Sequence, residues 1–168
     1  MTQDKLDITR ATEAIKDIRF VEALGLLESN LAKDPNHIDS LYLAAVCSRY
    51  LKNYDNSKKY IESLLSSAPD MGRAYQELGH LNRDMGNGEN AIAHYRQACE
   101  LNPALLASWK ALYDYFRISK NKPAADHAYM QINTLQSIPS VLLYISQILN
   151  EGKLGIAEEK CREFLKKN

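Results

Sequence analysis

The stretch that decides the fold is residues 74–103, AYQELGHLNRDMGNGENAIAHYRQACELNP. Apolar residues recur in it at helical spacing on both sides of the Gly-Asn-Gly turn at 86–88, where glycine adopts positive φ without steric cost. Pro103 closes the stretch, because proline cannot continue a helix but can start the next one. We therefore expect two antiparallel helices joined by a short turn. The small residue Gly79 would let these two helices approach closely.

The same arrangement recurs every 34 residues along the chain. Each kind of residue keeps its own place in the period: proline (Pro35, Pro69, Pro103), small (Ala23, Ser57, Ala91, Ala125) and bulky (Leu27, Ile61, Tyr95, Tyr129). A fixed period of this kind predicts a stacked array of helical hairpins. Strand patterns, which alternate apolar and polar residues, are missing. The predicted fold is all-α, a right-handed α-solenoid of about four to five hairpins, with turns near 52–53, 86–88, 121–122 and 151–152.

Composition and charge restrict the function classes. Apolar residues make up 45% of the 168 residues, which is typical of a folded protein. Lysine plus arginine and aspartate plus glutamate are both 21, so non-specific binding of nucleic acid is not expected. The first residues show no apolar h-region, so we expect no secretory signal, and no apolar run reaches the roughly 20 residues needed to cross a bilayer. The three isolated cysteines fit reduced thiols, and we expect a cytoplasmic protein.

The repeats resemble those of the tetratricopeptide repeat family. The residues that carry the resemblance are Tyr75, Leu78, Gly79, Ala91, Tyr95, Ala98 and Pro103 in the third repeat, Leu41, Ala45, Tyr54, Ile61 and Pro69 in the second, and Trp109, Leu112, Ala125 and Tyr129 in the fourth. The resemblance implies a superhelix that acts as a scaffold for binding protein or peptide. It covers nearly the whole chain, as one domain over 1–168 with repeats near 4–37, 38–71, 72–105, 106–137 and 138–168.

A second resemblance concerns two shorter segments. Residues 101–112 and the tail 158–168 are similar to bacterial proteins whose repeats precede a sulfotransferase domain. This implies an alternative function, the regulatory or substrate-docking region of a sulfotransferase whose catalytic domain lies beyond Asn168. The chain would then be a piece of a longer one and would contact its own C-terminal domain. Self-association through an apolar stacking face is a third possibility.

Catalytic and metal-binding patterns are not found. The four histidines form no i, i+4 pair, and no CxxC motif occurs. The adjacent carboxylates Glu158 and Glu159 follow one another along a helix and do not face across a cleft. We therefore expect no catalytic residue, no metal and no cofactor, and this chain alone is not predicted to be an enzyme.

A candidate partner-binding groove lies on the first helix of each repeat, next to the stripe that packs inward. Its predicted residues are Tyr42, Val46, Arg49, Tyr50, Arg73, Gln76, His80, Arg83, Lys110, Asp114 and Arg117. Tyrosine and arginine are the residues that dominate binding energy at interfaces, and the cations favour an acidic partner. The alternative is an ordinary solvated surface on which Asp84 and Asp114 pair with the arginines. Some relatives clamp a chaperone C-terminus with lysine and asparagine, but Tyr42, Val46 and Glu77 occupy those places here.

Overall fold

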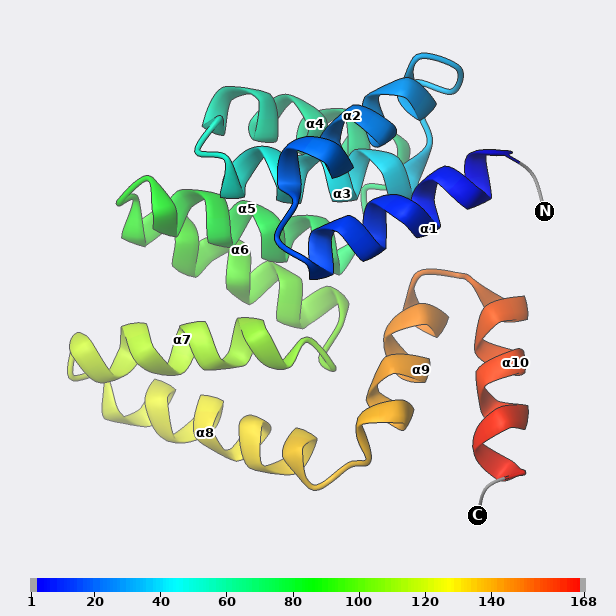
Figure 1. The fold of residues 1–168 in the computed structure, drawn as a ribbon. Coiled ribbons are helices and arrows are strands. Elements are labelled where there is room, and N and C mark those ends of the chain that lie inside the picture. The colour runs from blue at the N-terminus through cyan, green and yellow to red at the C-terminus, as the bar shows by residue number, and fades with distance from the viewer. Residues whose placement is uncertain (1–2, 167–168) are drawn as a thin grey trace. The chain divides into compact units, whose positions relative to one another are not determined.

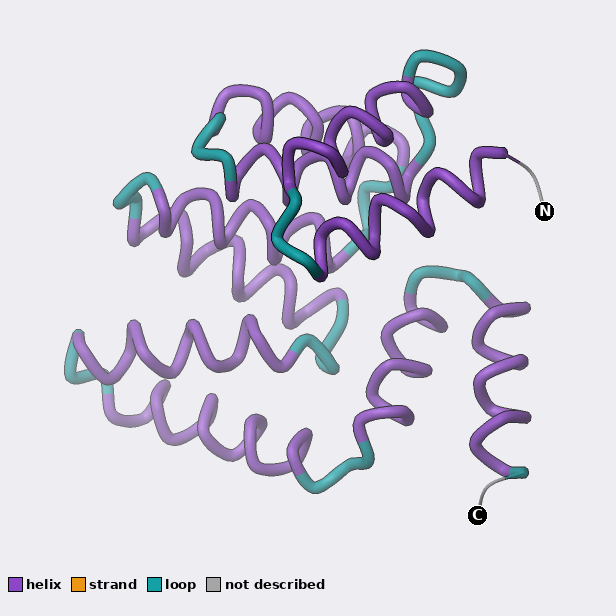
Figure 2. Tube along the Cα trace, in the orientation of Figure 1, coloured by secondary structure: helices purple, strands orange, loops and turns teal. Residues whose placement is uncertain are grey.

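The computed structural model describes residues 3–166, and all regular secondary structure in this part of the chain is α-helix (Figure 2). The helices are α1 (Gln3–Lys16), α2 (Phe20–Leu31), α3 (Ile38–Tyr50), α4 (Tyr54–Ser67), α5 (Gly72–Asp84), α6 (Gly88–Leu101), α7 (Leu106–Ile118), α8 (Lys122–Gln136), α9 (Ser140–Asn150) and α10 (Leu154–Leu165). The prediction of an all-α fold built from helical hairpins is confirmed.

The chain divides into two compact units. Of the described residues, the first unit contains 3–70 and 80–87, and the second contains 71–79 and 88–166. Helix α5 therefore contributes its N-terminal part to the second unit and its C-terminal part to the first.

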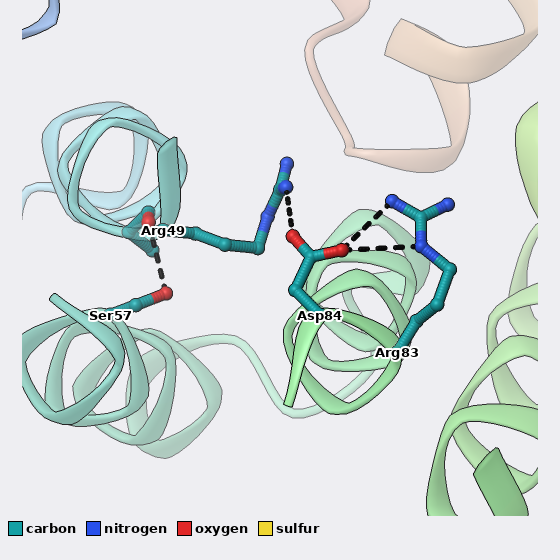
Figure 3. A network of polar contacts seen from close by, with 5 residues as sticks. Arg49, Ser57, Arg83 and Asp84 are labelled. Carbon is teal, nitrogen blue, oxygen red and sulfur yellow. Dashed lines mark hydrogen bonds and ion pairs between the residues drawn. The ribbon is translucent and has the colours of Figure 1, made fainter. Parts of the chain in front are cut away.

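In the first unit, α2 packs against both α1 and α3, and α3 packs against α4. Small side chains dominate its core, which comprises Ala11, Ala14, Ala23, Leu27, Ala44 and Cys47. Ser57 occupies the small place of the period in α4, and its hydroxyl donates to the Ala45 carbonyl in α3 at 3.0 Å (Figure 3). Small residues and this buried hydrogen bond let the helix backbones approach closely.

In the second unit, α7 packs against α6 and α8, and α9 packs against α10. The main core cluster comprises Ala91, Tyr95, Cys99, Leu112, Phe116, Ala125 and Ala128. A Cβ placed on Gly79 would lie only 2.5 Å from two ring carbons of Tyr95. The prediction that Gly79 is a point of close contact between two helices is therefore confirmed.

The turns lie where the sequence predicts them, and each contains one residue with a positive φ. Positive φ occurs at 62° in Ile18, 60° in Lys52, 79° in Gly86, 56° in Lys120 and 71° in Gly152. The first four positions are 34 residues apart, and the last follows after 32 because the final linker is two residues shorter. Each reverses the chain just after a first helix.

Asparagine caps begin two of the second helices. Asn53 accepts a hydrogen bond from the Asn56 amide at 3.2 Å, and Asn121 accepts one from the Ala124 amide at 3.3 Å. Both caps satisfy amides that have no partner within the helix. The period therefore repeats the helix starts as well as the turns.

The fourth hairpin differs from expectation at Tyr129. This residue holds the bulky place of the period, but its side chain is 51% exposed. In the third repeat, Gly79 leaves room for the ring of Tyr95, whereas the corresponding residue of the fourth repeat is Tyr113. The two rings of Tyr113 and Tyr129 therefore meet at 5.8 Å, and Tyr129 lies outside.

The fifth hairpin also departs from the regular arrangement. In Figure 1, α9 and α10 run across the direction of α7 and α8. Leu154, the first residue of α10, is an apolar side chain that stays exposed. The apolar contacts of this hairpin form a small cluster of Ile145, Ile148 and Ala157 with Val141 and Cys161.

Candidate partner-binding surface

The predicted groove residues are divided between the two units. The first unit contains Tyr42, Val46, Arg49, Tyr50, His80 and Arg83; the second contains Arg73, Gln76, Lys110, Asp114 and Arg117. All of them lie on the first helices of their hairpins, α3, α5 and α7, as predicted.

The structure brings several members together in the first unit around Asp84. The Arg49 guanidinium Nη1 donates to Asp84 Oδ2 at 2.8 Å, across from α3 to α5 (Figure 3). Arg83 donates to Asp84 Oδ1 through Nε at 3.3 Å and Nη2 at 3.2 Å. The Asp84 carboxylate thus accepts hydrogen bonds from two arginines at once. We call Arg49, His80, Arg83 and Asp84 the Arg49 cluster.

Burial distinguishes the two arginines of the Arg49 cluster. The side chain of Arg49 is only 7% exposed, so it offers a partner little open surface, and its role in the groove stays a prediction. It is enclosed because the α3 and α5 helices approach and Asp84 compensates its charge. The side chain of Arg83 remains exposed at the surface. Asp84 does pair with both arginines here, as the alternative of an ordinary solvated surface expects, and partner binding at this surface stays a prediction.

The same contacts set the protonation of the Arg49 cluster. Burial, and then the charges of Arg49 and Arg83, lower the pKa of His80 to about 4. Burial by itself would raise the pKa of Asp84, but the hydrogen bonds and charges of Arg49 and Arg83 together lower it. At neutral pH the imidazole is therefore uncharged and the carboxylate is ionised. The Arg49 cluster itself thus comprises two arginines, one carboxylate and one uncharged imidazole.

Aromatic rings adjoin the Arg49 cluster. Tyr50 stacks on Phe20 with ring centroids 4.6 Å apart, and the Arg49 guanidinium carbon lies 4.5 Å from the Tyr50 ring centroid. The side chain of Tyr50 is 54% exposed. Sequence reasoning missed Phe20 as part of this surface, since its place in the period marks only the start of a second helix. An exposed aromatic ring next to two arginines is suited to binding an apolar residue flanked by an acidic one.

In the second unit, two predicted groove residues contact the protein itself. Arg73 Nη1 donates to Glu151 Oε1 at 3.0 Å, and Lys153 Nζ lies 2.9 Å from Glu151 Oε2. Gln76 Oε1 accepts from the Ser108 hydroxyl at 3.0 Å. Both side chains are therefore partly covered by contacts within the chain, Arg73 by the α9–α10 turn and Gln76 by α7, and their place in a partner-binding groove stays a prediction.

The remaining predicted residues lie on α7. Lys110, Asp114 and Arg117 are all exposed, at the spacing of one helix face. The Arg117 guanidinium carbon lies 5.9 Å from the ring centroid of Tyr113.

The described residues bear on three further possibilities: a reactive thiol, a metal site and a membrane-spanning helix. Burial, then the charge of Glu100, raises the pKa of the Cys99 thiol to about 12, so this thiol stays protonated. No three His, Cys, Asp or Glu side chains among residues whose placement is described gather as metal ligands would. Over the same part of the chain, every helix is too short or too polar to span a bilayer.

The fold and this surface define a class of protein. Stacked antiparallel hairpins present extended surfaces for binding other proteins, and the chain is an all-α repeat protein of this protein-interaction class. Residues 38–71 and 72–105 each match the family model of the tetratricopeptide repeat. The hairpins α3–α4 and α5–α6 are therefore tetratricopeptide repeats. No significant match was found among curated proteins.

Solved structures of similar fold are repeat proteins. MamA from Desulfovibrio magneticus RS-1 is 18% identical with a TM-score of 0.67, over 80% of this chain and 76% of that one. The first repeat domain of Spaghetti (RPAP3), bound to the HSP90 peptide SRMEEVD, is 15% identical with a TM-score of 0.63, over 70% and 94%. A mutant O-GlcNAc transferase from Thermobaculum terrenum is 20% identical with a TM-score of 0.62, over 69% of this chain and 23% of that chain. At these identities the likeness shows the fold.

Proposed function

We propose that this protein binds a segment of a partner protein along the first helices of its repeats, and that the segment combines an acidic residue with an apolar one. The observation that carries the proposal is the Arg49 cluster beside the exposed ring of Tyr50. A tyrosine held by stacking loses little freedom on binding, and arginine and tyrosine are common among residues that dominate interface energy.

The cations on the first helices favour an acidic residue in the bound segment. The whole chain has no formal net charge, yet the Arg49 cluster has two arginines for one carboxylate. In the second unit, α7 likewise presents two exposed cations, Lys110 and Arg117, with Asp114 on the same helix face. Complementary charge raises the rate of association and excludes partners of like charge. The peptide held by Spaghetti (RPAP3), SRMEEVD, is itself acidic, which supports the same chemistry on the same fold.

The other candidate functions stay predictions. The sulfotransferase resemblance rests on residues 101–112 and 158–168, and no comparison bears on it. Self-association, a single domain over 1–168, the absence of catalytic and cofactor sites, and a cytoplasmic location likewise stay predictions.

A random peptide library displayed on phage tests the proposal without a known partner. We expect the unmodified protein to select peptides that share acidic residues next to an aromatic or aliphatic one. Binding of a selected synthetic peptide should weaken as salt rises, because exposed charges are screened beyond about 8–10 Å at physiological ionic strength.

A pair of charge-reversed variants locates the binding surface. Arg83→Glu with Arg117→Glu changes two exposed first-helix cations and should abolish binding of the selected peptide. Lys59→Glu with Arg162→Glu makes the same change of charge on exposed residues of second helices and should leave binding intact. Equal loss in both double variants, or selection of peptides with no acidic residue, would refute the proposal.

A further inference from the structure

The turn between α9 and α10 places a carboxylate on the first-helix surface of the second unit. The side chain of Glu151 is only 6% exposed, and its Oε1 accepts from Arg73 of α5 at 3.0 Å. The two residues are 78 apart in the sequence. Arg73 is one of the cations that the sequence assigns to the partner-binding groove. The guanidinium of Arg73 is thus already paired with an acidic residue of the same chain.

A second contact attaches the same hairpin to the second unit. The Gln147 side-chain amide Nε2 in α9 donates to the Ala104 carbonyl in the α6–α7 loop at 3.2 Å. Both contacts are polar, and water or a bound peptide can replace polar contacts at small net cost. The hydrogen bond from Gln147 brings α9 next to the α6–α7 loop, in which Ala104 is buried.

The α9–α10 hairpin keeps apolar contacts of its own. Ile145 and Ile148 of α9 pack against Ala157 of α10, with Val141 and Cys161 beside them. The main core cluster of this unit is formed by α6, α7 and α8 instead. Residues 137–139, which end in Pro139, link α8 to α9 without helical structure. A hairpin that holds itself together can move away from Arg73 without unfolding its neighbours.

From these contacts we propose that the α9–α10 hairpin is an autoinhibitory element in which Glu151 occupies Arg73 and competes with the acidic residue of the partner. This inference rests on the proposed function, because Arg73 is one of the first-helix cations that the sequence assigns to the partner-binding groove. Partner binding must displace Glu151, and the partner's carboxylate then replaces it on Arg73. Lys153 lies on the same turn, with its Nζ 2.9 Å from Glu151 Oε2, so this contact moves with the hairpin.

Glu151→Gln tests the competition directly, since it keeps the size of the side chain and removes its charge. The peptide library is selected separately on the unmodified protein and on Glu151→Gln, and the affinity of each selected peptide is measured for both. We expect a selected peptide to bind Glu151→Gln about fivefold more tightly than the unmodified protein. The reason is that the peptide no longer has to break the ion pair between Glu151 and Arg73, and an ion pair at a protein surface is worth up to about 1 kcal/mol, which corresponds to this change in affinity. The matched control is Glu158→Gln, which removes a carboxylate of α10 that pairs with Arg162 of the same helix at 2.7 Å. Its affinity should equal that of the unmodified protein.

Hydrogen exchange of the unmodified protein supplies an independent measurement if Glu151→Gln folds poorly. Peptide binding should increase deuterium uptake in residues 140–165, because the hairpin leaves its position, while uptake on α3 and α5 falls. Peptides that bind all three proteins equally, with uptake in 140–165 unchanged or lowered, would overturn the autoinhibition and leave the proposed function standing. Failure of every selection would instead overturn the proposed function itself.

Discussion

Replacement of Gly79 with alanine tests the tightest helix contact of the second unit. A Cβ on Gly79 would lie 2.5 Å from Cδ1 and Cε1 of Tyr95 and 2.9 Å from its Cγ. Real Cβ atoms essentially never come within 3.0 Å of another heavy atom. Tyr95 is fully buried, so its ring has no solvent space to enter. The added methyl group must therefore push α5 and α6 apart or force the ring from its preferred rotamer.

The expected loss of stability combines two opposite effects. Extra volume in a packed interior costs about 1–3 kcal/mol. Alanine in a helix interior is favoured over glycine by about 1 kcal/mol, which offsets part of that cost. We expect Gly79→Ala to lower the free energy of unfolding by up to about 2 kcal/mol, the difference between these two effects.

Gly25 provides the matched control for this substitution. It lies inside α2, and no heavy atom outside its own neighbourhood lies within 4 Å of a Cβ placed there. Gly25→Ala therefore gains helix propensity without crowding and should stabilise the protein by about 0.5–1 kcal/mol. The same chemical change thus has opposite signs at two helical positions.

Urea unfolding followed by far-UV circular dichroism measures both variants. A Gly79→Ala protein as stable as Gly25→Ala would refute the close contact. The double variant Gly79→Ala with Tyr95→Leu adds a further check, because the smaller side chain removes the clash. The cost of Gly79→Ala should then largely disappear, as expected for two residues in direct contact.

Two further predictions concern a strained turn and a buried histidine. Ile18 has a φ of 62° and its side chain is 74% exposed, so Ile18→Gly should relieve left-handed strain and raise the unfolding free energy by about 1 kcal/mol; a lower urea midpoint would contradict this. The pKa of His80 is lowered from 6.5 to about 4, so the unfolded chain binds a proton first and stability falls as pH drops from 6.5 towards 4. His80 should lower the free energy of unfolding by about 2 kcal/mol at pH 5. Urea unfolding at pH 7 and pH 5 measures this loss, and the free energy of unfolding should change less between the two pH values for His80→Gln than for the unmodified protein. An equal difference in both proteins would contradict the shift.

The sequence by itself determined the helices, their turns and one helix contact. Helical periodicity, glycine turns and the recurrence every 34 residues are local properties, because each depends on residues within one hairpin. They correctly predict the turns near 52–53, 86–88, 121–122 and 151–152, and the close approach at Gly79. They also place every predicted groove residue on a first helix.

The tertiary structure decided which of these groove residues have partners within the chain. Arg49 pairs with Asp84, 35 residues away, and Arg73 pairs with Glu151, 78 residues away. Helical spacing tells which face of a helix a residue occupies, but it carries no information on which charged side chain of another hairpin faces it. Tyr129 shows the same dependence, since its ring lies outside only because Tyr113 stands where the third repeat has glycine. Side-chain partners across hairpins depend on the distance between backbones and on the volume already filled, and both become defined only when the chain is packed.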